Sequence, residues 1–294
     1  MIIDLKEIPP QKVHGYLLSA VVPRPIAFAS TIDKAGNVNL SPFSFFNVFG
    51  TNPPVLIFSP SRRGRDNTTK HSYENVMEVP EVTINIVNYA IVQQASLASG
   101  EYPRGTNEFI KAGLTPLPSV RIAPPCVAES PVSFECIVRQ VIPTGDQGGA
   151  GILVICEVLL MHIRDEILDQ DGRIDPFKLD AVARMGGDWY CRASGDNLFK
   201  LPQPGNKTGV GVDLLPEAIR NSKVLTGNEL GILGSAHALP SREKIKDWLN
   251  DPSVNAARKE GEEQVHQLIR THLQHGDVEN AWALIQAVYE KSPD

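Results

Sequence analysis

Short runs of apolar and β-branched residues dominate the first two thirds of the chain. The run Ile26–Ile32 alternates large apolar with small residues, Asp33–Asn37 contains the glycine of a hairpin connection, and Val38–Phe46 predicts the returning strand. Short strands at this density favour a closed sheet, so we expect a β-barrel. The other predicted strands are Val55–Ser59, Val82–Asn88, Val132–Ile142 and Ile152–Ile163, with helices at Thr68–Met77 and Ala90–Ala98 and a turn at Asn107–Ala112.

The pattern changes after Pro202–Gly205, where Leu-Pro-Gln-Pro-Gly interrupts regular structure. Helices are predicted at Leu214–Asn221, Ser241–Leu249, Ser253–Gln274 and Val278–Lys291. The last two carry apolar stripes at helical spacing, formed by Val265, Leu268, Ile269 and Leu273 and by Val278, Trp282, Ile285 and Tyr289. Gly276-Asp277 joins them into a helical hairpin, with Asp277 as the N-cap. We expect one domain at 1–204 and a helical extension at 205–294, packed on the barrel or on a partner subunit.

Composition and charge narrow the class of protein. The 294 residues are 42% hydrophobic and 21% charged, which is typical of a globular chain with a sizeable core. The 28 basic and 34 acidic residues are interspersed and give a net charge of −6, so we expect no nucleic-acid and no membrane partner. No apolar run approaches the roughly 18 residues of a membrane span. The first ten residues contain Asp4 and Glu7 instead of the basic region and apolar stretch of a signal peptide. We therefore expect a cytoplasmic protein.

Cysteine and histidine spacing gives no metal or nucleophile motif. The four cysteines form no C-x-x-C pair, and Cys136 and Cys156 lie in apolar strand patterns, which predicts reduced, buried thiols. The seven histidines are scattered without the spacing of metal ligands, so we expect no metal site. No G-x-S-x-G elbow is present, which leaves hydrolase chemistry without support.

Hydroxyl and basic side chains gather after the third predicted strand. Arginine offers a planar donor fork, lysine a point charge, and the amides at the start of the helix predicted from Thr68 favour an anion. A solvated loop has the same charge pattern, but the flanking hydroxyls favour a phosphate site. No Gly-rich dinucleotide fingerprint is present. The cluster comprises Ser59, Ser61, Arg62, Arg63, Arg65, Thr68, Thr69, Lys70 and Ser72.

The second predicted strand combines small polar side chains with aromatic ones. Ser41, Ser44 and Asn47 lie among Phe43, Phe45 and Phe46. This mixture suits a flat polar heteroaromatic ligand that lies against a sheet. A ring site next to a phosphate site is the resulting hypothesis.

These segments resemble the flavin reductase-like family, whose FMN-binding split barrel includes flavoredoxin-like flavoproteins. The similar motifs are PRPIA at Pro23–Ala27, the turn Asp33–Asn39, SPFSFFN at Ser41–Asn47, Pro53-Pro54 and SPSRR at Ser59–Arg63. Similar segments follow at 109–114, 128–136, 151–168 and 186–204, so the resemblance covers about residues 15–204. It implies a mainly β fold with helices: an FMN-binding split β-barrel, here followed by a C-terminal α-helical extension.

The resemblance also implies a cofactor, partners and site residues. It predicts FMN, NAD(P)H as electron donor, a homodimer, and no catalytic side chain, because the flavin itself carries the redox steps. Arg24 is either a flavin contact or a structural ion-pair partner. We expect Ser59, Ser61, Arg62, Arg63, Lys70 and Ser72 at the phosphate, and Ser41, Pro42, Phe43, Ser44, Phe46 and Asn47 at the ring and ribityl chain.

Two departures from the family pattern bear on chemistry. Many members have K-D-T where this chain has Lys70-His71-Ser72, and a histidine there is expected to be partly cationic near pH 6.5. Gly151 stands where some flavin reductases place a histidine beside the nicotinamide. Three functions therefore stay open: a flavin reductase, an FMN-binding electron carrier without its own NAD(P)H turnover, and a dimeric scaffold whose helical tail binds a partner.

Overall fold

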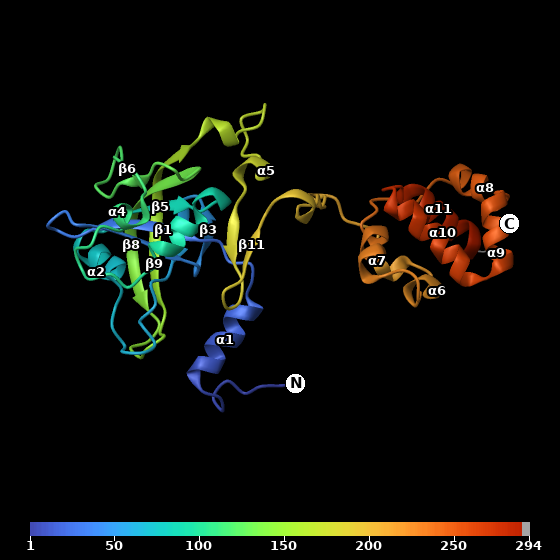
Figure 1. The fold of residues 1–294 in the computed structure, drawn as a ribbon. Helices are drawn as coiled ribbons and strands as arrows, with labels where there is room; N and C mark the ends of the chain where they lie inside the picture. Colours follow the sequence, from blue (N-terminus) through green and yellow to red (C-terminus); the bar gives the residue numbers. More distant parts are fainter. Residues whose placement is uncertain (290–294) are drawn as a thin grey trace. The chain divides into compact units, whose positions relative to one another are not determined.

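The computed structural model describes residues 1–289, and the chain divides into two compact units, Met1–Phe199 and Lys200–Asp294 (Figure 1). The first unit contains the β-sheet and the second is helical. No helix among the described residues is long and apolar enough to cross a membrane.

A seven-stranded antiparallel sheet forms the centre of the first unit. Its order is β2-β1-β5-β8-β9-β4-β3. The strands are β1 (Ala27–Ile32), β2 (Val38–Phe43), β3 (Phe46–Thr51), β4 (Pro54–Phe58), β5 (Glu81–Ile86), β8 (Val132–Pro143) and β9 (Ile152–Ile163).

The connection between β2 and β3 shows that this sheet curls into a barrel. These strands lie at opposite edges of the sheet, yet only Ser44 and Phe45 separate them. Three Cα steps reach at most about 11 Å. A flat sheet of this size would hold its edge strands about 29 Å apart, so the edges must meet. The prediction of one strand over Val38–Phe46 is therefore wrong: the first strand ends at Phe43 and another begins at Phe46.

Successive side chains of β1 point to opposite faces of the strand and pack into two separate apolar cores. Ala27 and Ala29 pack with Phe43 and Phe58 in one cluster. Phe28 points to the other face, where it packs with Phe109. This two-residue period is what a strand buried on both faces requires. Three helices cover the sheet: α2 (His71–Glu78), α3 (Val92–Leu97), which follows a 3₁₀ turn at Tyr89–Ile91, and α4 (Glu108–Ala112).

Several elements of this unit differ from the sequence prediction. Helix α1 (Pro10–Ala20) was not predicted, and none of its residues is buried. Helix α2 begins at His71, three residues later than expected. A hairpin of β10 (Val182–Arg184) and β11 (Tyr190–Arg192) lies beyond the sheet. The remaining elements are β6 (Pro116–Leu117), β7 (Cys126–Val127) and α5 (Pro176–Leu179), with 3₁₀ turns at Asp165–Ile167 and Gly195–Asn197.

The second unit is a bundle of short helices. The predicted helix Ser253–Gln274 is wrong, because Gly261 adopts a φ of 124° that divides it. Lys291, the predicted end of the last helix, lies outside the described residues. After a 3₁₀ turn at Val212–Leu214, the helices are α6 (Glu217–Arg220), α7 (Gly227–Gly234), α8 (Arg242–Leu249), α9 (Pro252–Glu260), α10 (Glu262–Gln274) and α11 (Val278–Tyr289).

The helical unit has a core of its own. Val265 and Ile269 of α10 are buried against Trp282 and Ile285 of α11 in one cluster. The indole of Trp282 also donates a hydrogen bond to the carbonyl of Leu233 at 2.8 Å. The apolar stripes are thus covered by helices of the same unit. The expectation that the extension packs on the barrel or on a partner subunit stays a prediction.

Candidate flavin site

A cavity of about 460 Å³ opens where the barrel edges meet. Most of the predicted site residues line it, although they come from two separate parts of the chain. One set belongs to the β2–β3 connection and the other to the loop that follows β4. The predicted residues in the lining are Pro42, Phe43, Ser44, Ser59, Ser61, Arg62, Arg63 and Lys70.

Backbone hydrogen bonds fix the loop that follows β4. The amide of Arg62 donates to the carbonyl of Ala150 at 3.0 Å, and the amide of Gly149 donates to the carbonyl of Arg62 at 3.1 Å. Ser59 Oγ accepts from the amide of Ile152 at 3.0 Å. The β8–β9 connection therefore holds the hydroxyl and basic side chains at the cavity wall.

The cavity carries an excess of positive charge. Its lining includes Arg62, Arg63, Arg65 and Lys70 but a single carboxylate, that of Glu101. Glu101 pairs with Arg65 and lies 3.6 Å from Arg63 Nε. Arg63 Nε is buried and has no hydrogen-bond partner among the described residues. Such an orphaned charged donor, in a cavity that Ser59 and Ser61 also line, fits a phosphate group.

The N-terminus of α2 adds to the positive potential of this cavity. Lys70 is the N-cap and provides no side-chain acceptor for the first amides of the helix. Burial lowers the pKa of Lys70, and the neighbouring Arg63 lowers it further. Burial also lowers the pKa of His71, which makes its partial positive charge near pH 6.5 smaller than expected.

Besides Arg24, four predicted residues lie outside the cavity lining. Ser72 is buried and its Oγ accepts from Asn39 Nδ2 at 2.8 Å. The side chain of Phe46 packs against the barrel core. Asn47 is exposed, and its Oδ1 accepts from the following amide at 2.8 Å. Ser41 lies within β2 opposite Ala29.

Arg24 is held by main-chain oxygens. Its guanidinium donates to the carbonyls of Leu18, Val21 and Met185, and its Nε lies 3.4 Å from Ser44 Oγ. No carboxylate pairs with it among the described residues. Burial lowers the pKa of Arg24, and the nearby Arg184 lowers it further. Of the two predicted roles, this geometry favours a structural one, with carbonyls in place of the expected ion pair.

A second cavity of about 530 Å³ adjoins the first and contains Gly151. The two share Leu18, Phe45 and Ser61 in their linings. A Cβ built on Gly151 lies 3.2 Å from Thr144 Oγ1 and 3.6 Å from Ser59 Oγ, and the backbone of Gly151 is outside the left-handed region. A side chain at this position would therefore point close to the flavin cavity.

Sequence reasoning did not assign several lining residues to the site. Arg65 belongs to the basic run, which was a usable signal. Phe45 lies inside the predicted ring segment but was not assigned to the site. Leu18 and Glu101 come from segments with no recognisable motif, and only the fold brings them to the cavity.

Cys126, Glu135 and His162 form a group whose ligand atoms lie within 4.8 Å of one another. The Glu135 carboxylate already accepts from the amides of Val120 and Arg121 at 2.8 and 2.7 Å and lies 2.7 Å from His162 Nε2. Because three donors occupy this carboxylate, we interpret the group as a clamp that fixes the 119–121 loop.

Comparison with known proteins agrees with this geometry. The family model described as "Flavin reductase like domain" matches residues 18–178. An uncharacterized protein of Aquifex aeolicus is 38% identical over 197 residues, which cover 67% of this chain and 98% of that protein.

Two solved structures extend the comparison. Nitrilotriacetate monooxygenase component B from Bacillus cereus is 28% identical, with a TM-score of 0.64 over 68% of this chain and 98% of that one. A split-barrel protein assigned as a flavin reductase, from Shewanella frigidimarina, is 28% identical, with a TM-score of 0.58 over 69% and 99%.

This chain belongs to the flavin reductase-like family. The predicted split β-barrel with C-terminal helices is confirmed. Membership supports a flavin cofactor and a reductase type of function.

Proposed function

We propose that this protein is an FMN-dependent oxidoreductase of the flavin reductase type, which takes electrons from NAD(P)H and passes them to a flavin, protein or oxygen acceptor. The observation that carries this proposal is the basic cavity at the junction of β2, β3 and the loop after β4. Family membership supplies the reaction class.

The donor set favours FMN over FAD. Arg62, Arg63 and Lys70 with the hydroxyls of Ser59 and Ser61 suit a terminal phosphate dianion. Nothing in the lining marks an adenine pocket, which FAD would need beyond its pyrophosphate. FMN therefore satisfies the charged groups without leaving a large part of the ligand unbound.

The protein residues bind and orient, while the flavin supplies hydride and electron transfer. The Pro42–Phe45 connection offers a narrow apolar and hydroxyl surface for the ring, beside the basic loop for the phosphate. Arg24 supports this connection through Ser44 and through the carbonyls at the end of α1. Phe43 stacks at 5.4 Å on Phe58 and anchors the connection in the core.

Gly151 favours a second candidate function, an FMN-binding electron carrier without its own NAD(P)H turnover. A glycine provides neither a ring to stack on a nicotinamide nor a hydrogen-bond donor from its side chain. On this alternative, another protein reduces the bound flavin.

Two measurements separate these functions. Titration of the FMN-free protein with FMN and with FAD tests the cofactor, and we expect tighter binding of FMN. Anaerobic mixing of the FMN-loaded protein with NADH and with NADPH then tests turnover through the flavin absorbance. Bleaching by either nucleotide supports the reductase, whereas unbleached FMN supports the carrier. Absence of flavin binding contradicts both.

We further infer a homodimer, as the family resemblance implies. Apolar side chains stay exposed on α1 and on the edge strand β3, where Val48 and Phe49 are 59% and 64% exposed and Leu17 and Val21 are 49% and 63% exposed. We infer that a second subunit covers these exposed apolar side chains. Light scattering on Phe49→Lys tests this inference. A monomeric variant supports it, and a monomeric wild-type protein contradicts it.

A further inference from the structure

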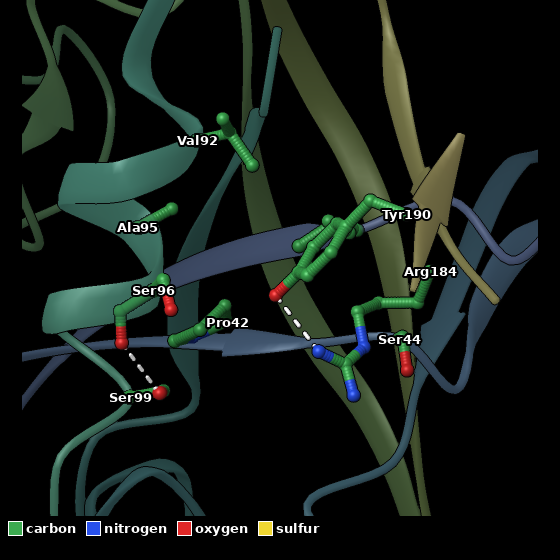
Figure 2. Close-up of a pocket in the computed structure, with 9 residues that line it drawn as sticks. Pro42, Ser44, Val92, Ala95, Ser96, Ser99, Arg184 and Tyr190 are labelled. Atoms are coloured by element: carbon green, nitrogen blue, oxygen red, sulfur yellow. Dashed lines mark hydrogen bonds between the residues drawn. The ribbon is translucent and has the colours of Figure 1, made fainter. Parts of the chain in front are cut away.

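A third cavity, of about 250 Å³, adjoins the Pro42–Ser44 segment and is not explained by a flavin phosphate site (Figure 2). It shares Pro42 and Ser44 with the flavin cavity. Its other walls come from α3 and from the β10–β11 hairpin, which contributes Arg184 and Tyr190. We call it the Arg184 cavity.

Arg184 has unused hydrogen-bonding capacity in this cavity. Its Nη1 donates to the hydroxyl of Tyr190 at 2.8 Å, and its Nη2 donates to the carbonyl of Gly187 at 2.8 Å. A guanidinium carries five N–H donors, so three have no partner among residues 1–289. No carboxylate of the described residues forms an ion pair with Arg184, and none lines the cavity.

Structural contacts hold this guanidinium in place. Arg184 and Arg24 exchange backbone hydrogen bonds of 2.9 and 3.0 Å, which join β10 to the segment before β1. The Tyr190 ring lies 4.6 Å from the guanidinium carbon, a cation–π arrangement. Figure 2 shows the Tyr190 hydroxyl and the Arg184 guanidinium side by side, with Ser44 close to the guanidinium. The charge is therefore pre-positioned, which reduces the entropy cost of binding.

The remaining walls define the size and polarity of a ligand. Ile26, Pro42, Val92 and Ala95 form an apolar surface, and Ser96 and Ser99 add hydroxyls. A cavity of about 150 Å³ is large enough for benzene, so this volume holds one six-membered ring with a small substituent. A cation at one end and apolar walls at the other match an anionic group on such a ring.

We propose that the Arg184 cavity binds the carboxylate of a small monocyclic organic acid, with Arg184 as a bidentate donor and Tyr190 as a supporting hydroxyl. The inference rests on the proposed function only in placing this acid next to the flavin ring. A neutral carboxamide of the same shape is the competing ligand, since it also fits one ring and a small polar group. Its lack of charge leaves the guanidinium without a counter-ion.

Calorimetric titration with benzoate and with benzamide tests the proposal on the full-length protein, with and without FMN. We expect benzoate to bind at least tenfold more tightly than benzamide. Arg184→Gln should weaken benzoate binding roughly 10- to 100-fold, and Tyr190→Phe a few-fold. Arg184→Lys, which keeps the charge, should lie between wild type and Arg184→Gln. Arg192→Gln is the matched control, because Arg192 lies on the same hairpin, pairs with Asp180 and is outside this cavity.

The titrations with and without FMN distinguish the proposed carboxylate site from the proposed flavin function. Equal affinity for benzamide, unchanged benzoate binding in folded Arg184→Gln, or no benzoate binding to the wild-type protein overturns the carboxylate site. If FMN fails to bind while benzoate binds with the expected Arg184 dependence, the proposed flavin function is overturned and the carboxylate site stands.

Discussion

Arg24 and Arg184 face each other across an antiparallel bridge, and neither guanidinium pairs with a carboxylate among residues 1–289. Their surroundings differ. Arg24 is buried and donates to main-chain oxygens, whereas Arg184 is partly exposed and retains free donors in a cavity. Two adjacent, uncompensated cations repel each other and favour a bound anion. Arg24 therefore serves the architecture, and Arg184 is free for a ligand.

We expect Arg24→Ala to destabilise the first unit by about 3 kcal/mol, because it leaves the carbonyls of Leu18, Val21 and Met185 without their donor. Hydrogen exchange of residues 1–199 in urea measures this change. Arg139→Ala is the control, since Arg139 is exposed and pairs with Glu157 at the surface, where loss costs under about 1 kcal/mol. Equal stability of both variants would contradict the structural role of Arg24.

Arg62→Ala is expected to weaken FMN binding by roughly 1.5 to 3 kcal/mol, or about ten- to a hundredfold, as for loss of a charge-assisted hydrogen bond. Lys70→Ala should act in the same direction. Fluorescence titration of the FMN-free variants provides the dissociation constants. Arg62 Nε also donates a hydrogen bond to Asn67 Oδ1 at 2.6 Å. Asn67→Ala removes this contact but keeps the charge of Arg62, so it measures how much affinity is lost through disorder of the loop alone. Unchanged affinity in both Arg62→Ala and Lys70→Ala rules out the phosphate site.

Much of the barrel could be predicted from sequence, because each strand shows its own local pattern. The runs at 82–88, 132–142 and 152–163 match β5, β8 and β9 closely. The break at Ser44-Phe45 was not visible, since small polar and aromatic residues are mixed on both sides of it. The position of β2 and β3 at opposite edges of the sheet, joined by two residues, depends on long-range closure of the sheet. No local pattern encodes that closure.

The candidate site residues that belong to one continuous loop were the easiest to predict from the sequence. The four basic side chains of the segment Ser59–Lys70 line one cavity. Ser72 was misleading: its hydroxyl fits the phosphate pattern, but α2 turns it toward Asn39 in the interior. Arg184 and Tyr190 lie about 140 residues from Ser44 in sequence, and the β10–β11 hairpin alone brings them to the same cavity.

Gly151→His should accelerate anaerobic flavin reduction by NADH or NADPH roughly two- to tenfold, the usual worth of one added hydrogen bond. The backbone of Gly151 allows a side chain, and Thr144 Oγ1 must shift by only a few tenths of an ångström. Stopped-flow absorbance measures the rate. Gly151→Ala is the matched control, because it adds the Cβ without the ring. Rapid bleaching of the wild-type flavin would instead show that no histidine is needed here.

The second unit should lose stability in mild acid. Burial lowers the pKa of His266, whose ring nitrogens lie 2.8 Å from Ser222 Oγ and 2.9 Å from the Tyr289 hydroxyl. The unfolded chain, with an ordinary value of about 6.5, then binds the proton more readily than the folded unit. Stability is therefore full above about pH 6.5 and falls as the pH drops toward the lower folded value.

Urea unfolding at several pH values, followed by tryptophan fluorescence, measures this slope. His266→Gln should flatten it between about pH 6.5 and 5. His275→Gln should leave it unchanged, because His275 is exposed at the end of α10. An unaltered slope in folded His266→Gln would assign the acid sensitivity to other groups.

The helical unit should be dispensable for flavin binding, because its core is separate and the candidate flavin cavity is lined only by residues of the first unit. Trp282→Ala in the full-length chain tests this independence. Trp282 is fully buried in the helical core, so truncation should destabilise the second unit by about 3 to 5 kcal/mol. The FMN dissociation constant should change less than about twofold, since the lining residues described for the cavity all belong to the first unit. Loss of FMN affinity while the first unit keeps its hydrogen-exchange protection would show that the helical unit takes part in the flavin site.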